Sequence, residues 1–268
     1  MIAVQTNQAS FVEQLNWHSN QSTAALKQLA SGSRLLAPQD DAAGLAVATR
    51  MEAQLLQLNA TSNNVSNAVS YTQTQSGYLA GAQKVLNRMG ELAIRAQDGT
   101  ISDDIRALYN NEFQALKDTF NDARTARYNE VDLFDGQTLA VAISPESGSI
   151  EVGGVDLFTA EMNALTANST QLDTLANAGS ALDSVLEASN QLTQNRASLG
   201  STLSELETAS SQIATNRAST TATLSQIRDA NVADAITSFT REQILTQTSV
   251  FALQQANSQR ANVLNLLS

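Results

Sequence analysis

Apolar residues recur at every third and fourth position along two long stretches of the chain. In residues 182–227 this spacing holds for fourteen positions, nine of them apolar and the rest Ser, Thr or Arg. Residues 51–93 repeat the same rhythm. A sustained seven-residue repeat is typical of helices that supercoil around a partner. The two stretches can bury their stripes against each other, so the predicted fold is mainly α, with a long antiparallel coiled-coil rod.

The same spacing, with turn and capping signals, predicts the remaining elements. Asp40 or Asp41 is suited to the N-cap of the second helix, and Asp98-Gly99 to its end. Short strand-like runs at 139–143 and 149–152 predict a small β-hairpin insertion. The predicted helices span residues 4–30, 41–97, 103–127, 161–180, 180–228 and 231–267. Along the first of them, one stripe comprises Val12, Leu15, Ser19, Ser22, Leu26 and Leu29.

The last predicted helix, 231–267, is apolar on more than one face. Val250, Leu253 and Leu264 share one face, whereas Ile244 and Phe251 lie on another. Helices of this kind are normally buried. No stretch reaches the roughly 18 consecutive apolar residues of a membrane span. This helix is therefore expected to find its burial against other protein, and to become ordered on association.

Composition and charge narrow the function classes. Only 4% of the residues are aromatic and 15% are charged, which is low for an enzyme domain. The net charge of −11 and the scattered Lys and Arg argue against nucleic acid and anionic membranes as partners. Cysteine is absent, and the N-terminus has no basic segment followed by an apolar run, so no cleaved signal peptide is expected.

Candidate catalytic and metal-binding groups are sparse. The single histidine, His18, lies beside Trp17 and is interpreted as a packing or surface residue. Asp103-Asp104 lies at a predicted helix start, where carboxylates favour the helix dipole, so capping is the better interpretation. Gly153-Gly154 lacks the helix and lysine of a phosphate loop. Neither an enzyme activity nor a cofactor is expected.

Several motifs, in order at both ends of the chain, resemble bacterial flagellin. Near the N-terminus they are 29–35 (LASGSRL), 38–48 (PQDDAAGLAVA) and 86–93 (LNRMGELA). Near the C-terminus they are 195–200 (NRASLG), 227–234 (IRDANVAD), 254–257 (QQAN) and 263–267 (VLNLL). The resemblance covers about 1–135 and 180–268. It implies a structural subunit that polymerises into the flagellar filament for motility.

The family resemblance also implies a division of the chain. Residues 1–40 with 231–268 would form an inner coiled-coil core, and 41–135 with 175–230 a surrounding helical rod. Residues 136–174 would be a short β-hairpin and loop insertion in place of large outer domains. The residues expected to build the assembly core are Leu15, Leu26, Leu29, Ile244, Val250, Phe251, Leu253, Val263, Leu264 and Leu267.

The partners implied by the resemblance are other copies of the chain, a flagellar export chaperone, a filament cap and hook-junction proteins. The implied location is the extracellular filament, reached through the flagellar secretion channel. An animal innate immune receptor would read Arg88, Leu92 and Glu112, although Gly90 stands where arginine is common. Two alternatives share the architecture: a hook-filament junction protein, and a surface-displayed flagellin homologue that acts as a binding module.

Overall fold

The computed structural model describes the backbone of residues 2–143 and 148–267, and within it the side chains of residues 9–143, 148–259 and 261. Contacts divide the chain into two compact units. The terminal unit comprises Met1–Leu55 with Ala218–Ser268, and the central unit comprises Leu56–Arg217. The helices are α1 (Ile2–Ser31), α2 (Ala42–Ala96), α3 (Asp103–Arg124), α4 (Ala160–Thr166), α5 (Leu175–Arg228) and α6 (Val232–Leu267).

In the central unit α2 and α5 pair along the predicted seven-residue repeat. Gln83 donates to Ser189 (2.8 Å) and Gln97 to the carbonyl of Ala178 (3.3 Å), so the two helices run antiparallel. Every seventh residue of each helix is buried: Leu58, Val65, Thr72, Leu79, Leu86 and Ala93 on α2, and Ala178, Val185, Leu192, Leu199, Leu206 and Ile213 on α5. The predicted antiparallel coiled-coil rod is therefore confirmed.

Helix α3 packs its apolar stripe against this pair. Phe113 and Phe120, seven residues apart, are fully buried and join one core with Met89 and Phe134. Ser102 is the N-cap of α3 and its hydroxyl accepts from the amide of Ile105. Much of the aromatic content of the chain is thus concentrated where three helices meet.

Two small antiparallel sheets follow α3. The predicted hairpin is present as β3 (Thr138–Ala142) paired with β4 (Ser149–Gly153), with Leu139 opposite Val152. The second sheet, β1 (Arg127–Tyr128) with β2 (Val131–Asp132), was not predicted, because two-residue strands leave no alternation to detect. Its turn places Asn129 and Glu130 in the left-handed region, with φ of 49° and 66°.

The prediction of helix over 161–180 is only partly right. Helix α4 ends at Thr166, and α5 begins only at Leu175. Two backbone carbonyls of the break, those of Ala167 and Thr170, accept hydrogen bonds from Nζ of Lys117 on α3. The Thr174 hydroxyl accepts from the amide of Asn177 at the start of α5. A tertiary contact and a cap therefore stabilise non-helical backbone that apolar spacing alone does not reveal.

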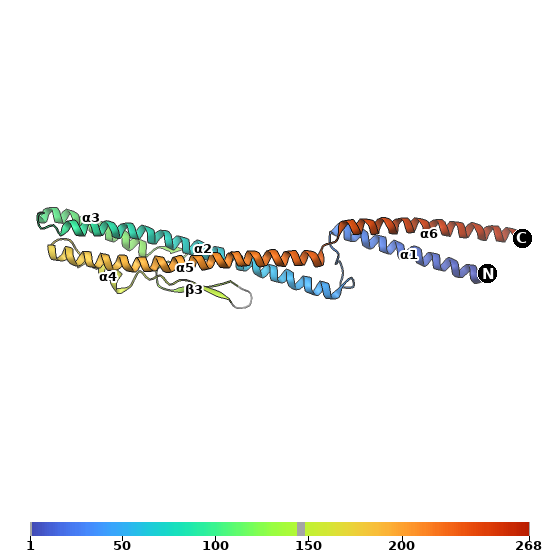
Figure 1. Cartoon of the computed structure of the whole chain (residues 1–268), viewed down its shortest axis with the longest axis horizontal. Coiled ribbons are helices and arrows are strands. Elements are labelled where there is room, and N and C mark those ends of the chain that lie inside the picture. The colour runs from blue at the N-terminus through green and yellow to red at the C-terminus, as the bar shows by residue number, and fades with distance from the viewer. Residues whose placement is uncertain (1, 144–147, 268) are drawn as a thin grey trace. The chain divides into compact units, whose positions relative to one another are not determined.

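In the terminal unit α1 and α6 lie side by side and antiparallel (Figure 1). At one end, the amide of Arg34 donates to the Arg228 carbonyl (2.6 Å), and the amide of Ala230 donates to the Gly32 carbonyl (2.9 Å). Gly32 has a φ of +68°, a left-handed conformation that glycine adopts without strain and that ends α1. These bonds join the two helices at one end of the pair.

The described seam between α1 and α6 also follows a seven-residue repeat. Its inward residues on α1 are Phe11, Leu15, His18, Ser22, Ala25 and Leu29, and on α6 they are Ala235, Phe239, Glu242, Thr246, Ser249, Leu253 and Ala256. The stripe predicted for the first helix was therefore only half right. Leu15, Ser22 and Leu29 face inward, but Val12 and Leu26 are exposed.

The capping prediction for α2 is confirmed. The carboxylate of Asp41, the residue before α2, accepts from the amide of Gly44 (2.8 Å). Asp40 instead accepts from the amides of Leu36 and Ala37, which closes the turn between α1 and α2. The two adjacent carboxylates thus act as backbone caps, as their position at a helix start suggested.

Candidate assembly surface

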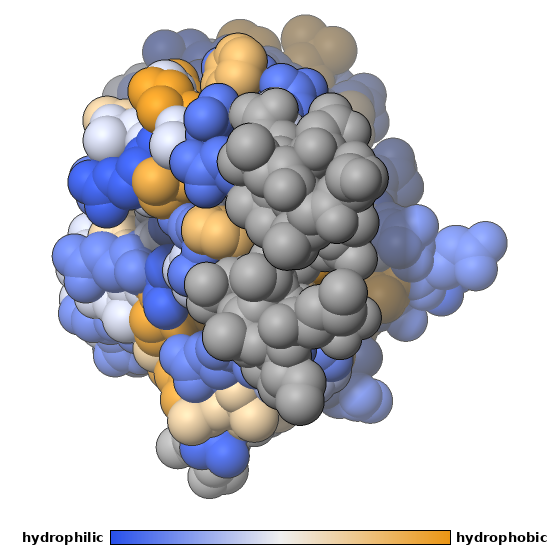
Figure 2. All heavy atoms as spheres, turned by 90° about the vertical axis from the view of Figure 1, so that its right-hand side faces the viewer, coloured by the Kyte–Doolittle hydropathy of each residue, from blue (hydrophilic) through white to orange (hydrophobic). Residues whose placement is uncertain are grey.

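Large apolar side chains remain exposed on both helices of the terminal unit. On α1 they are Val12, Trp17 and Leu26, and on α6 they are Val232, Ile236, Ile244, Val250 and Phe251. Phe251 is 68% exposed and Ile244 is 58% exposed. In the face shown in Figure 2, apolar residues (orange) are interleaved with hydrophilic ones (blue). A set of large exposed apolar side chains on two paired helices is typical of a surface that another protein covers.

The residues expected to form the assembly core fall into three groups. Leu15, Leu29 and Leu253 are half-buried in the seam between α1 and α6. The exposed members are Leu26, Ile244, Val250 and Phe251. The side chains of the remaining members, Val263, Leu264 and Leu267, lie outside the described residues. The assembly role of all ten stays a prediction.

The outward face of α6 carries a shallow groove of about 460 Å³. Ile236, Thr240 and Ile244 follow one another at four-residue spacing along it, and Arg241 and Leu245 lie beside them. This row continues toward Phe251, so the exposed apolar surface of α6 is a stripe along the helix axis. A stripe of this shape suits another helix or a neighbouring subunit better than a small ligand.

Sequence reasoning missed the polar pair inside the seam. His18 of α1 places Nδ1 2.6 Å from Oε2 of Glu242 on α6, and each side chain is only 15% exposed. The Trp17 ring lies edge-on to the imidazole, with ring centroids 4.9 Å apart. His18 and Glu242 are 224 residues apart in the sequence. The stripe predicted for the first helix did not include His18, and the seven-residue spacing from His18 to Ala25 is a sequence signal consistent with a place in the seam.

The surface predicted to face an immune receptor is only partly available. Arg88 donates to Glu112 (2.8 Å) and to Glu91 (2.9 Å), and these side chains are accessible. The hydrogen bond from Arg88 lowers the pKa of Glu112, and the bonds to Glu112 and then Glu91 raise the pKa of Arg88. Leu92, in contrast, has no exposed surface and belongs to the core, so its direct contact with a receptor is excluded in this fold.

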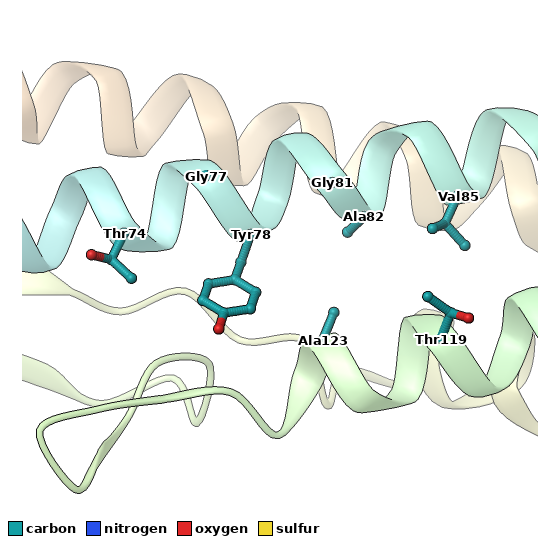
Figure 3. Close-up of a pocket in the computed structure, with 8 residues that line it drawn as sticks. All are labelled: Thr74, Gly77, Tyr78, Gly81, Ala82, Val85, Thr119 and Ala123. Atoms are coloured by element: carbon teal, nitrogen blue, oxygen red, sulfur yellow. The ribbon is translucent and has the colours of Figure 1, made fainter.

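A second groove, of about 520 Å³, lies between α2 and α3 in the central unit (Figure 3). Tyr78 and Val85 point from α2 toward Thr119 and Ala123 of α3. Its α2 side includes Gly81, where an added Cβ would meet no atom within 4 Å. The lining is apolar and carries no convergent charged groups, so the groove has the character of incomplete helix packing, not of a reaction site.

Buried cations on α3 serve the fold of the central unit. Arg106 donates to the carbonyls of Ala96 and Asp98 at the end of α2. Burial lowers the pKa of Lys117, and it also lowers that of Arg124, whose guanidinium lies 4.4 Å from the Phe158 ring centroid. Each of these groups has backbone or side-chain acceptors from its own unit, which marks it as structural.

Two further features of the described residues bear on the class of protein. They contain no group of three or more His, Asp or Glu side chains placed to hold a metal ion. None of the described helices is long and apolar enough to cross a membrane. The features that stand out are long paired helices and an uncovered apolar stripe, and together they define a helical structural protein built for contact with other protein.

Comparison with known proteins identifies the family. Residues 2–138 match the bacterial flagellin N-terminal helical region, and residues 182–267 match the bacterial flagellin C-terminal helical region. Flagellins of Halalkalibacterium halodurans and Listeria monocytogenes are each 33% identical, over 92% and 91% of both chains. The flagellar filament 30.7 kDa core protein of Treponema maltophilum is 32% identical over 95% of both chains. The chain belongs to the bacterial flagellin family.

Solved structures share the fold. A crystal structure of Bacillus cereus flagellin gives a TM-score of 0.51 at 21% identity, covering 56% of this chain and 88% of that one. A putative flagellar hook-associated protein from Vibrio parahaemolyticus gives a TM-score of 0.63 at 12% identity, covering 71% and 100%. Because the close sequence relatives are flagellins and filament core proteins, the chain is a structural subunit of the extracellular flagellar filament, not an enzyme. The junction and binding-module alternatives are not favoured.

Proposed function

We propose that α1 and α6 build the filament core and that the central helices surround it. In this division residues 1–40 with 231–268 are the inner part, 41–135 with 175–230 are the rod, and 136–174 are a short insertion. The observation that carries the proposal is the set of exposed apolar side chains on α1 and α6, which these two helices leave uncovered when they pair. Neighbouring copies of the chain supply the missing cover.

The free energy available from this cover is substantial. Fully burying a Val, Leu, Ile or Phe side chain contributes about 1.5–3 kcal/mol. Since the exposed apolar residues of α1 and α6 retain roughly half of their accessible surface, each contributes about 1 kcal/mol on assembly. The ordering of side chains and helix ends opposes this gain, so assembly requires many such residues at once.

Removal of residues 231–268 tests the division directly. The continuous hydrophobic core of the central unit draws only on residues between Leu58 and Ile213, so the truncated chain keeps it intact. We expect a folded rod by circular dichroism and no filaments by electron microscopy, even with added filament seeds. Filaments grown from the truncated chain would refute the proposed core.

A point variant sharpens the test. Phe251→Ser removes the most exposed ring of α6, whereas Gln254→Ser changes an exposed polar residue one turn away on the same helix. We expect the first variant to raise the subunit concentration needed for polymerisation and the second to leave it unchanged. Equal behaviour of the two variants would show that the exposed apolar stripe is not an assembly contact.

The proposed partners follow from the same surface. Before assembly, the apolar stripe of α6 needs cover, which an export chaperone would provide until the chain leaves through the secretion channel. A filament cap and hook-junction proteins would then meet the paired terminal helices at the two ends of the filament. Recognition by an animal innate immune receptor would rest on Arg88 and Glu112, because Leu92 is buried.

A further inference from the structure

The pair formed by His18 and Glu242 is unlike the rest of the seam between α1 and α6. Its atoms approach to 2.6 Å, and 85% of each side chain is shielded from solvent. Trp17, the single tryptophan of the chain, makes a T-shaped ring contact with the imidazole. The His18–Glu242 pair is a hydrogen-bonded side-chain contact between α1 and α6.

The other seam residues specify the pairing only weakly. Many are small or carry a hydroxyl, such as Ser22, Ala25, Ala235, Thr246 and Ser249. Side chains of this size fit many partners, so packing alone tolerates a slip or rotation of one helix against the other. A repeat of seven also makes neighbouring registers resemble one another in their apolar pattern.

A slip by one repeat would break the polar pair. In an antiparallel pair it places either Ala235 or Ser249 opposite His18, in place of Glu242. The Glu242 carboxylate would then remain in the seam without its hydrogen-bond partner His18. A largely buried carboxylate without a partner is strongly unfavourable, so this pair discriminates between registers that the apolar residues do not distinguish.

The backbone bonds at the base of the two helices do not replace this role. They join Gly32 and Arg34 to the segment 228–230, at one end of the pair. His18 lies fourteen residues before Gly32, about 21 Å away along the helix at 1.5 Å per residue. These bonds hold only one end of the pair, and the His18–Glu242 contact holds the two helices together at a second point.

We propose that His18 and Glu242 are a positioning pair that fixes the register and rotation of α6 on α1. Glu242 points into the seam, and Ile244, two residues further, lies about 200° around the helix and faces outward. Holding the carboxylate inward therefore holds Ile244, and the apolar stripe to which it belongs, toward neighbouring subunits. The pair serves the specificity of assembly more than the stability of the subunit.

The decisive variant replaces both members with leucine, His18→Leu with Glu242→Leu. A well-packed apolar pair is commonly as stable as the largely buried polar pair that it replaces, so heat denaturation should show no loss of stability. We expect this full-length variant to elongate wild-type filament seeds at least about tenfold more slowly, as followed by light scattering, because α6 samples several registers. The matched control, Ser22→Ala with Ser249→Ala, changes the seam but keeps the pair, and should elongate at the wild-type rate.

Exchange of the partners, His18→Glu with Glu242→His, separates pairing from individual contacts. This variant re-forms the pair and should restore elongation to within about threefold of the wild-type rate. If His18 or Glu242 acted by touching a neighbouring subunit, the exchange would not restore it. An exchanged variant that elongates at least about tenfold more slowly than the wild type would overturn the proposal, and this comparison with the wild type stands even if the leucine variant does not fold.

Cross-linking measures the register without polymerisation. The chain has no cysteine, so Ala25→Cys with Ala235→Cys introduces a single reporter pair. These positions lie seven residues from His18 and Glu242 in opposite directions, and both are buried, so they face each other in the observed register. We expect the leucine variant to lower the disulfide yield in unassembled protein at least about threefold. An unchanged yield would overturn the proposal whether or not filaments form.

Discussion

The free energy that holds the central unit together should come from the repeat positions of α5, and a matched pair of leucines tests this. Leu192 occupies a repeat position and has no exposed surface, whereas Leu186, six residues earlier on the same helix, is 53% exposed. Replacing either with alanine gives a similar small change in helix propensity. The difference between the two variants in the free energy of unfolding therefore isolates the contribution of the buried seam between α2 and α5.

The expected magnitudes differ several-fold. Leu192→Ala removes a fully buried side chain from a core of packed residues and should cost about 3 kcal/mol, within the range of 2–5 kcal/mol found for buried leucines. Leu186→Ala removes a half-exposed side chain and should change the free energy of unfolding by about 0.5 kcal/mol or less. At about 2–4 °C per kcal/mol, the first change lowers the melting temperature by roughly 6–12 °C.

Urea unfolding followed by circular dichroism provides the measurement. The chain lacking residues 231–268 keeps the core of the central unit and is expected not to polymerise, so it serves as the background for both variants. A loss below about 1 kcal/mol for Leu192→Ala, or equal losses for both variants, would refute the assignment of stability to the α2–α5 seam.

Three further outcomes follow from the structure. Gly81→Ala should stabilise α2 by about 1 kcal/mol in thermal unfolding, because the new methyl group meets no atom within 4 Å and alanine favours helix over glycine. Asp41→Ala should cost about 1 kcal/mol, since the amide of Gly44 loses its acceptor, and Asp41→Asn should retain most of the stability. Burial lowers the pKa of Lys117 in the folded state, so the unfolded chain binds the proton more tightly and stability should rise with pH toward the ordinary value of 10.5. Lys117→Met should abolish that rise, and a slope unchanged by this substitution would contradict the assignment.

The seven-residue pattern determined much of the architecture from the sequence. It located the long helices, and every seventh position that it marked from Leu58 to Ala93 and from Val185 to Ile213 is buried, whereas other buried positions such as Tyr71, Met89 and Ala188 lie outside the marked pattern. Turn and cap residues placed the hairpin and the start of α2. These features depend on local spacing and on short side chain–backbone bonds, so a linear sequence contains them. The chain's family was also evident, because its motifs occur in order at both ends.

The tertiary structure decided what depends on distant neighbours. More than one stripe with three- and four-residue spacing can be drawn along α1. The position of α6 determines which stripe is covered, and it places His18 inward and Leu26 outside. Likewise Leu92 became a core residue, and Lys117 met the carbonyls of a segment fifty residues away. An amphipathic helix records which faces are apolar, but the partner's position determines which face is covered. The pairing of His18 with Glu242 exists only once two helices from opposite ends of the chain lie together.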